Sequence, residues 1–177
     1  PYRTPREIER VQTTSNNGVN LLQNEQAMTL QFCDLDLKDA KAVFQTFADR
    51  DMRQFRKLQM YIHAEEAVKN APGNPIKDKE LTAVIRLGTD FVNNYYEIRI
   101  PLYVTPLSAG NMNPDSDAYN DTLWNPRNSL DLDFAVLTRL KQNRNLSSIP
   151  IGQIYHELQS NGQTYSVMGN PNLAEVR

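Results

Sequence analysis

The sequence is poor in several features that would narrow its function. Cys33 is the only cysteine, so no intrachain disulfide can form and the cysteine pattern does not indicate a redox compartment. The 19 basic residues nearly balance the 21 acidic ones, and the net charge of -2 offers no large basic surface for nucleic acid. No apolar run reaches the roughly 18 to 20 residues that span a bilayer, so we expect no direct membrane insertion by this chain.

Length and composition favour one domain preceded by an arm. At 177 residues the chain can bury a substantial core but is short for two domains. Residues 1–25 are polar and rich in Thr, Asn and Gln, which is typical of an arm or loop. Because the chain begins at Pro1 and ends at Arg177 inside a patterned stretch, we expect a piece of a longer protein. The remainder, 26–177, is predicted to be a single domain that is truncated at its C-terminal end.

Three segments in the first half carry periodic apolar side chains. Residues 26–34 alternate Met, Leu and Phe with polar neighbours, which predicts a strand with one buried face. The alternation at 58–63 predicts a second strand in the same way. Between them, 40–47 has apolar residues at helical spacing, so a short helix is expected, and its β-rich composition leaves a strand as the alternative. The turn-forming residues of 71–79 predict a loop.

The stretch LTAVIRLGTDFVNNYYEIRIPLYV, residues 81–104, predicts a β-hairpin. Pairing Gly88 with Tyr95 makes one face wholly apolar, whereas a slip of one residue would expose that face to water. The same register sets Arg86 opposite Glu97, and such an ion pair on an exposed sheet face contributes roughly 0.2 to 1 kcal/mol. The polar residues of that face are therefore predicted to have a structural role rather than a catalytic one. The paired apolar residues are Leu87 with Tyr96, Ile85 with Ile98, Ala83 with Ile100, and Leu81 with Leu102.

The second half of the chain predicts a loop, a helix and another hairpin. Residues 105–127 are rich in Pro, Asp and Asn and are typical of a surface loop. Within 128–145, apolar residues recur at helical spacing behind residues that can cap a helix, so a short helix is expected there. Finally, Asn161-Gly162 separates two alternating runs and supplies the positive φ that a tight hairpin turn requires.

Three tyrosines are candidates for carbohydrate binding. Tyr61, Tyr95 and Tyr103 are expected to share one sheet face, and rows of aromatic side chains stack against sugar rings in many β-sandwich modules. The competing explanation is ordinary β-propensity, since tyrosine suits half-buried strands in any case. Sugar binding is therefore a hypothesis that depends on these three rings lying together.

Metal binding has only weak candidates. Asp115, Asp117 and Asp121 cluster in the acidic loop and could hold a structural calcium, but they lack the glycine and closing glutamate of an EF-hand. His63 and Glu65 could share one face of a strand, yet two donors are too few for a zinc site. We therefore predict no metal and no cofactor.

Catalytic chemistry is also hard to place. Cys33 has no neighbouring base in the sequence to activate it, and the glycine-containing turns lack the strand and helix that surround a phosphate loop. Glu97 and Glu157 could converge as a glycosidase pair, and this alternative stays open because one sequence does not show whether they meet. We expect the chain not to be an enzyme.

Several separated blocks resemble one family. NEQAMTLQFCDLDLKDAKAVF, DMRQFRKLQMYIHAEE, LTAVIRLGTDFVNNYYEIRIPL and VMGNPNLAEVR are similar to a segment of the SprA/Sov family, with DMRQF and NNYYEI the most telling. The resemblance covers most of 24–177, and 1–23 matches less clearly. It implies a part of the outer-membrane translocon of the type IX secretion system, which is tied to gliding motility. The resemblance does not assign a catalytic role to any residue of this sequence.

The resemblance and the strand pattern lead to one fold and two functions. The order of patterned segments looks like the galactose-binding-like jelly roll, so we predict a mainly β, jelly-roll-like β-sandwich with one or two short helices. The first function is a non-enzymatic structural or protein-interaction module of the translocon. Its expected partners are other parts of the parent translocon, secretion-system proteins and secreted cargo, at the outer membrane in the cell envelope. The alternative is a carbohydrate-binding β-sandwich module.

Overall fold

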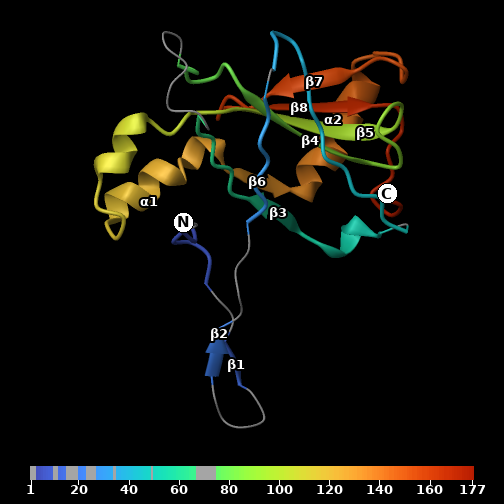
Figure 1. Ribbon diagram of the computed structural model, residues 1–177. Helices are drawn as coiled ribbons and strands as arrows, with labels where there is room; N and C mark the ends of the chain where they lie inside the picture. The colour runs from blue at the N-terminus through green and yellow to red at the C-terminus, as the bar shows by residue number, and fades with distance from the viewer. Residues whose placement is uncertain are drawn as a thin grey trace.

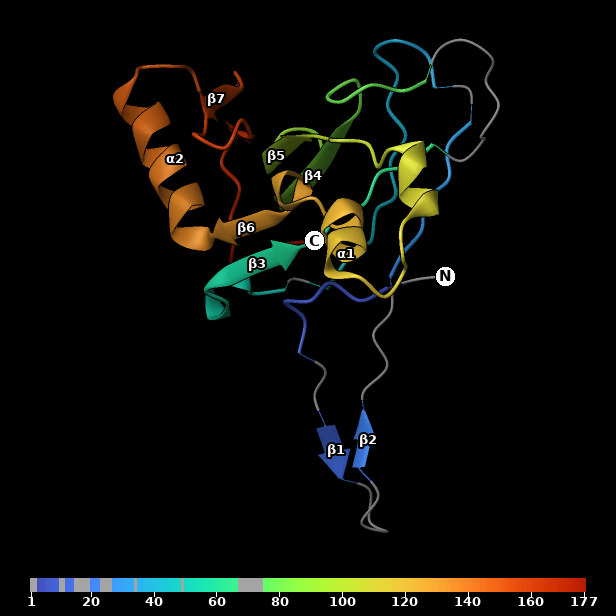
Figure 2. The same ribbon diagram turned by 90° about the vertical axis from the view of Figure 1, so that its left-hand side faces the viewer.

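The fold is mainly β, as the sequence predicts (Figure 1). The computed structural model describes residues 3–9, 12–14, 20–22, 27–33, 35–48, 50–66 and 75–177. Two antiparallel sheets of four and two strands, with two short α-helices, form the body of the protein in a manner consistent with a β-sandwich. A small separate ladder pairs β1 (Gln12–Thr14) with β2 (Asn20–Leu22) and projects away from this body in both views (Figures 1 and 2).

The larger sheet has the strand order β4-β5-β8-β7. Its members are β4 (Thr82–Gly88), β5 (Tyr95–Pro101), β7 (Tyr155–Leu158) and β8 (Thr164–Met168). The predicted register of the first hairpin is confirmed, including Gly88 opposite Tyr95, Ile85 opposite Ile98 and Arg86 opposite Glu97. The second hairpin is confirmed as well, and Gly162 in its loop has the expected positive φ of 83°.

A two-stranded sheet and the longer helix complete the core. β3 (Lys57–Met60) pairs with β6 (Leu130–Asp133), which continues directly into α2 (Phe134–Leu146). Asp133 makes this change of structure possible, because its carboxylate accepts a hydrogen bond from the Ala135 N–H (2.9 Å) and caps the helix. The predicted helix therefore begins later than expected. The core unites Tyr96, Ile98, Ile100, Tyr165 and Val167 of the larger sheet with Leu130, Leu132, Phe134, Leu137 and Leu140.

Short helices replace much of the predicted loop at 105–127. They are η2 (Leu107–Asn111), α1 (Asp117–Leu123) and η3 (Pro126–Asn128), while η1 (Met52–Gln54) precedes β3. Ser116 caps α1, since its hydroxyl oxygen accepts a hydrogen bond from the Tyr119 N–H (3.1 Å). The expectation of an irregular loop was wrong because this local capping signal was not recognised.

The strand predicted at 26–34 and the helix or strand predicted at 40–47 are absent from the described residues of those segments. Residues 27–33 and 35–48 contain no helix or strand. Apolar side chains that were expected to be buried are exposed, with Met28 at 75% and Phe44 at 74%. The period-two pattern is real, but a strand also needs a neighbour to accept its backbone hydrogen bonds, and the described part of the chain does not provide one.

Two parts of the prediction stay untested. The six strands of the two sheets do not establish a jelly-roll order, and the division between an arm and one domain also remains a prediction.

No helix among the described residues has the length and apolar character needed to cross a membrane.

Candidate functional site

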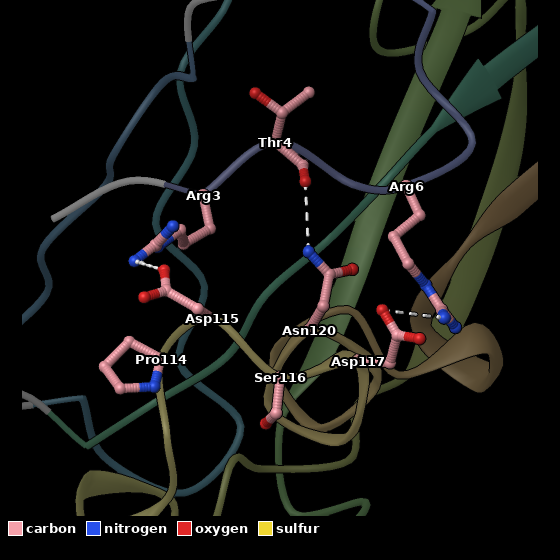
Figure 3. Close-up of a pocket in the computed structure, with 8 residues that line it drawn as sticks. All are labelled: Arg3, Thr4, Arg6, Pro114, Asp115, Ser116, Asp117 and Asn120. Carbon is pink, nitrogen blue, oxygen red and sulfur yellow. Dashed lines mark hydrogen bonds and ion pairs between the residues drawn. The ribbon is translucent and has the colours of Figure 1, made fainter.

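A hollow lies where the N-terminal residues meet the acidic segment. It is an open pocket of about 360 Å³ (Figure 3). Residues 3–6 form one wall, and the start of α1 with the turn before it forms the other (Figure 3). The lining residues are Arg3, Thr4, Arg6, Pro114, Asp115, Ser116, Asp117 and Asn120.

Ion pairs cross this pocket and involve all three predicted calcium candidates. An Arg3 guanidinium nitrogen lies 2.7 Å from Asp115, and Arg6 contacts both Asp117, at 3.4 Å, and Asp121. These side chains are largely exposed, so each pair contributes about 0 to 1 kcal/mol to stability. The carboxylates therefore serve to hold the N-terminal residues against α1.

Two backbone contacts reinforce the same docking. The Asn120 side-chain amide donates a hydrogen bond to the Thr4 carbonyl (3.1 Å), and the Trp124 indole N–H donates one to the Arg3 carbonyl (2.9 Å). Pro5, which directly follows these two residues, is fully buried. Sequence reasoning found the aspartates but missed these arginines, because more than a hundred residues separate the partners.

Calcium should leave the melting temperature unchanged, within about 1 °C at millimolar concentration. The physical reason is that three partly paired carboxylates do not form the set of six to eight oxygens that calcium prefers. Among the described residues, no group of three His, Cys, Asp or Glu side chains is placed to hold a metal ion. Thermal melts with calcium and with excess chelator check this. A rise of several degrees that chelator removes would instead establish a structural ion at Asp115, Asp117 or Asp121.

Glu97 is the most heavily engaged carboxylate of the larger sheet. Its side chain is 0% exposed, and it accepts hydrogen bonds from the Nε of Arg86 and the Nε of Arg99, both at 2.6 Å. Burial alone would raise the pKa of Glu97, but the hydrogen bonds and charges of Arg99 and Arg86 outweigh it and hold the pKa below its usual value. The prediction of an exposed ion pair was therefore wrong, since Glu97 is buried and paired with two arginines.

The tyrosine candidates do not form one stacking surface. Tyr95 is only 7% exposed, and the Arg86 guanidinium carbon lies 4.3 Å from the centre of its ring. Tyr103 follows the other end of β5, a distance along the strand of about 20 Å or more, and its ring contacts Lys79 and Arg127. Tyr61 lies beyond the end of β3 and is half-buried. The geometry gives no row of open rings.

His63, Glu157 and Cys33 are the remaining sequence candidates. His63 lies 3.8 Å from Glu65 and packs against the Trp124 ring at 5.9 Å, while burial lowers the pKa of His63 more than Glu65 raises it. Glu157 is on β7 and accepts hydrogen bonds from Asn143 and the Tyr155 hydroxyl, both at 2.8 Å. Cys33 is exposed.

A buried arginine is the polar feature that sequence reasoning missed. Arg144, on α2, is 2% exposed, and it donates hydrogen bonds to the Gly169 carbonyl and to the Asn145 side chain. One turn earlier on α2, Lys141 donates a hydrogen bond to the Pro171 carbonyl (3.1 Å). Both cations hold the segment that follows β8. The sequence pattern of α2 does not distinguish a buried arginine that holds this segment from an arginine exposed to solvent.

Comparison with known families decides the relationship. The whole chain, residues 1–177, matches the family model SprA_N, described as a motility related/secretion protein. The chain belongs to the SprA_N family. No curated protein matches it with significance. The resemblance inferred from the sequence blocks is thereby confirmed.

Membership of the SprA_N family gives the chain a secretion- and motility-related role and indicates association with the cell envelope. Charged side chains of this SprA_N chain form ion pairs within the fold. Arg3 pairs with Asp115, and Glu97 pairs with Arg86 and Arg99. Such arrangements hold segments together and fix a surface.

Proposed function

We propose that this chain is a non-enzymatic structural or protein-interaction module of a type IX secretion translocon, where it acts in protein export and gliding motility at the outer membrane. The observation that carries the proposal is the SprA_N match over residues 1–177. Its partners are other parts of the parent translocon, secretion-system proteins and secreted cargo.

The use of polar groups in the fold supports this role. In the pocket of Figure 3, Arg3 and Arg6 pair with the acidic residues that a ligand would otherwise meet. Glu97, which could have served as an acid or base, is enclosed by Arg86 and Arg99, whose charges favour its ionised form. These contacts supply rigidity rather than a reactive group. The carbohydrate-binding alternative has no comparable support, because Tyr95 is covered and distant from Tyr103.

Deleting residues 27–177 from the parent protein should block export of type IX cargo. Loss of a packed module disturbs the assembly around it, so we expect cargo in the culture medium to fall at least about tenfold. The measurement is cargo in the medium divided by translocon in the outer membrane, which separates loss of export from loss of the translocon itself. Colony spreading measures gliding in the same strains.

A matched surface variant serves as the control for this deletion. Combined replacement of Asp115, Asp117 and Asp121 by asparagine removes exposed ion pairs that each contribute little, so the module should remain folded and export should continue. Normal export from a deletion strain with normal translocon abundance would contradict the proposed role.

A further inference from the structure

Two cationic side chains gather on one tyrosine ring just beyond the end of β5. The Arg127 guanidinium carbon lies 4.8 Å from the centre of the Tyr103 ring, and the Lys79 Nζ lies 5.6 Å from it. Both distances are within the roughly 6 Å over which an aromatic face attracts a cation. The two charges are therefore no more than roughly 10 Å apart, which is about one Debye length, so they also repel each other. These three residues are called the basic tyrosine site.

Neither cation of this site pairs with a described carboxylate. None of the ion pairs among the described residues includes Lys79 or Arg127, and both side chains are exposed. Their backbone N–H groups donate hydrogen bonds to the Leu102 carbonyl and the Asn125 side chain. The ammonium group, the guanidinium group and the Tyr103 hydroxyl are thus donors that can serve a ligand.

A buried asparagine fixes the tyrosine and keeps one of the cations beside it. Asn128 is 1% exposed, and its side chain accepts a hydrogen bond from the Tyr103 N–H (2.7 Å) and donates one to the Tyr103 carbonyl (2.9 Å). Arg127 directly precedes Asn128, so these two bonds also keep the guanidinium group near the ring. Groups that are already in place lose less conformational entropy when a ligand binds.

The backbone of Lys79 adopts a conformation that glycine would take more easily. Its φ is 69°, in the left-handed region, where a residue with a Cβ is disfavoured. A hydrogen bond from the Lys79 N–H to the Leu102 carbonyl (2.6 Å) helps to hold this conformation. Glycine would remove the conformational cost, but it would also remove the ammonium group beside Tyr103. Residues held in this region occur often at binding sites, which supports a role for the Lys79 side chain.

Two acidic residues limit the charge of a suitable ligand. Asp78 and Glu80 flank Lys79 in the sequence. The Asp78 carboxylate accepts a hydrogen bond from the Val104 N–H (2.9 Å). The Glu80 carboxylate accepts one from the Lys77 N–H (2.9 Å). Both lie near the basic tyrosine site and would repel a doubly charged phosphate group or an anionic membrane surface, so a singly charged carboxylate fits better.

We infer that the basic tyrosine site binds a carboxylate on an acidic peptide segment of a protein partner. The planar fork of Arg127 donates two parallel hydrogen bonds to the two carboxylate oxygens, as guanidinium groups commonly do. Lys79 and the Tyr103 hydroxyl donate to the same carboxylate or to the next acidic side chain of the segment. The inference rests on the proposed role as a protein-interaction module and names the chemistry of one partner.

Nuclear magnetic resonance titration of the purified chain measures this binding. The probe is an acetylated and amidated peptide of three glutamates, and the control is the same peptide with three glutamines. The glutamate peptide should shift the amide signals of Tyr103 and Arg127 with a Kd of about 0.1 to 1 mM, because exposed ion pairs are individually weak. The glutamine peptide should bind at least about tenfold more weakly, and added salt should weaken binding of the glutamate peptide.

A pair of arginine variants separates the site from the general charge of the chain. Arg127→Gln should weaken binding of the glutamate peptide at least about fivefold, because it removes the charged fork. Arg139→Gln removes the same charge from an exposed position on α2 and should weaken binding less than about twofold. Both side chains are exposed, so both variants should keep the parent melting temperature.

The variant Lys79→Gly separates ligand binding from a purely structural role. It should weaken binding of the glutamate peptide at least about threefold, while its melting temperature equals or exceeds that of the parent, since glycine takes a φ of 69° without strain. If Lys79 only stabilised the Tyr103 ring, the melting temperature would fall and peptide binding would not change. That result would overturn the assignment.

Three further results would also overturn the inference. They are the absence of shifts at about 5 mM glutamate peptide, equal binding of the two peptides, and equal losses from Arg127→Gln and Arg139→Gln. Tighter binding of inorganic phosphate than of the glutamate peptide would assign the site to phosphate groups instead. All these results concern peptide binding by the purified chain. They are distinguishable from normal export by the deletion strain, which is the result that would contradict the proposed function.

Discussion

Replacing Ile98 with aspartate will unfold the domain at 25 °C. Ile98 is 0% exposed and lies in β5, between β4 and β8, with Ile85 and Tyr165 directly opposite. The change removes a large apolar side chain and buries a carboxylate that has no partner on that face. Deleting the side chain alone costs about 2 to 5 kcal/mol, and burying an unpaired charge adds several more. The sum is comparable with the whole stability of a domain of this size.

Two aspartate variants on the neighbouring edge strand give the comparison. Ile85→Asp should cost less than Ile98→Asp, since Ile85 is half-buried and water reaches its strand edge. Thr82→Asp, on the exposed side of the same strand, should cost less than about 1 kcal/mol. Urea melts followed by circular dichroism measure all three. Equal losses from the three variants would show that the faces of the hairpin are assigned wrongly.

The first hairpin could be predicted residue by residue because two constraints agree on its register. A one-residue slip would expose the apolar row of Ile85, Ile98 and Ile100, and it would also separate Arg86 from Glu97. Both constraints are local in sequence, and the turn between the strands is short. The burial of Glu97 could not be predicted in this way. It depends on Arg99, two residues along the same strand, turning back to cover the carboxylate.

Long-range pairing explains where prediction failed. The alternation at 27–33 shows that the segment can form a strand, but it contains no information about which edge it would join. The acidic segment was recognised from its composition, yet its partners Arg3 and Arg6 lie at the other end of the chain. Contacts of this kind are set by tertiary packing, which leaves no period or spacing in a single sequence.

Replacing Glu97 with glutamine should destabilise the domain by about 2 to 4 kcal/mol at pH 7. Breaking a buried ion pair by removing one partner typically costs about 3 to 5 kcal/mol, because the other charge is left without compensation. Here the loss is smaller, since Arg86 and Arg99 are partly exposed and regain some hydration. The matched control is Asp131→Asn, the same chemical change in an exposed pair with Lys57, which should cost less than about 1 kcal/mol.

The cost of Glu97→Gln should also depend on pH. The pKa of Glu97 in the folded protein lies below the ordinary value of 4.5, so its ionised form stabilises the fold above that value. This stability is lost as the pH falls through the folded pKa, because the protonated side chain pairs with the arginines no better than glutamine does. Free energies of unfolding from urea melts between pH 7 and pH 3 should therefore converge for parent and variant. A difference that stays constant over this range would show that the ionised carboxylate of Glu97 is not what holds Arg86 and Arg99 in place.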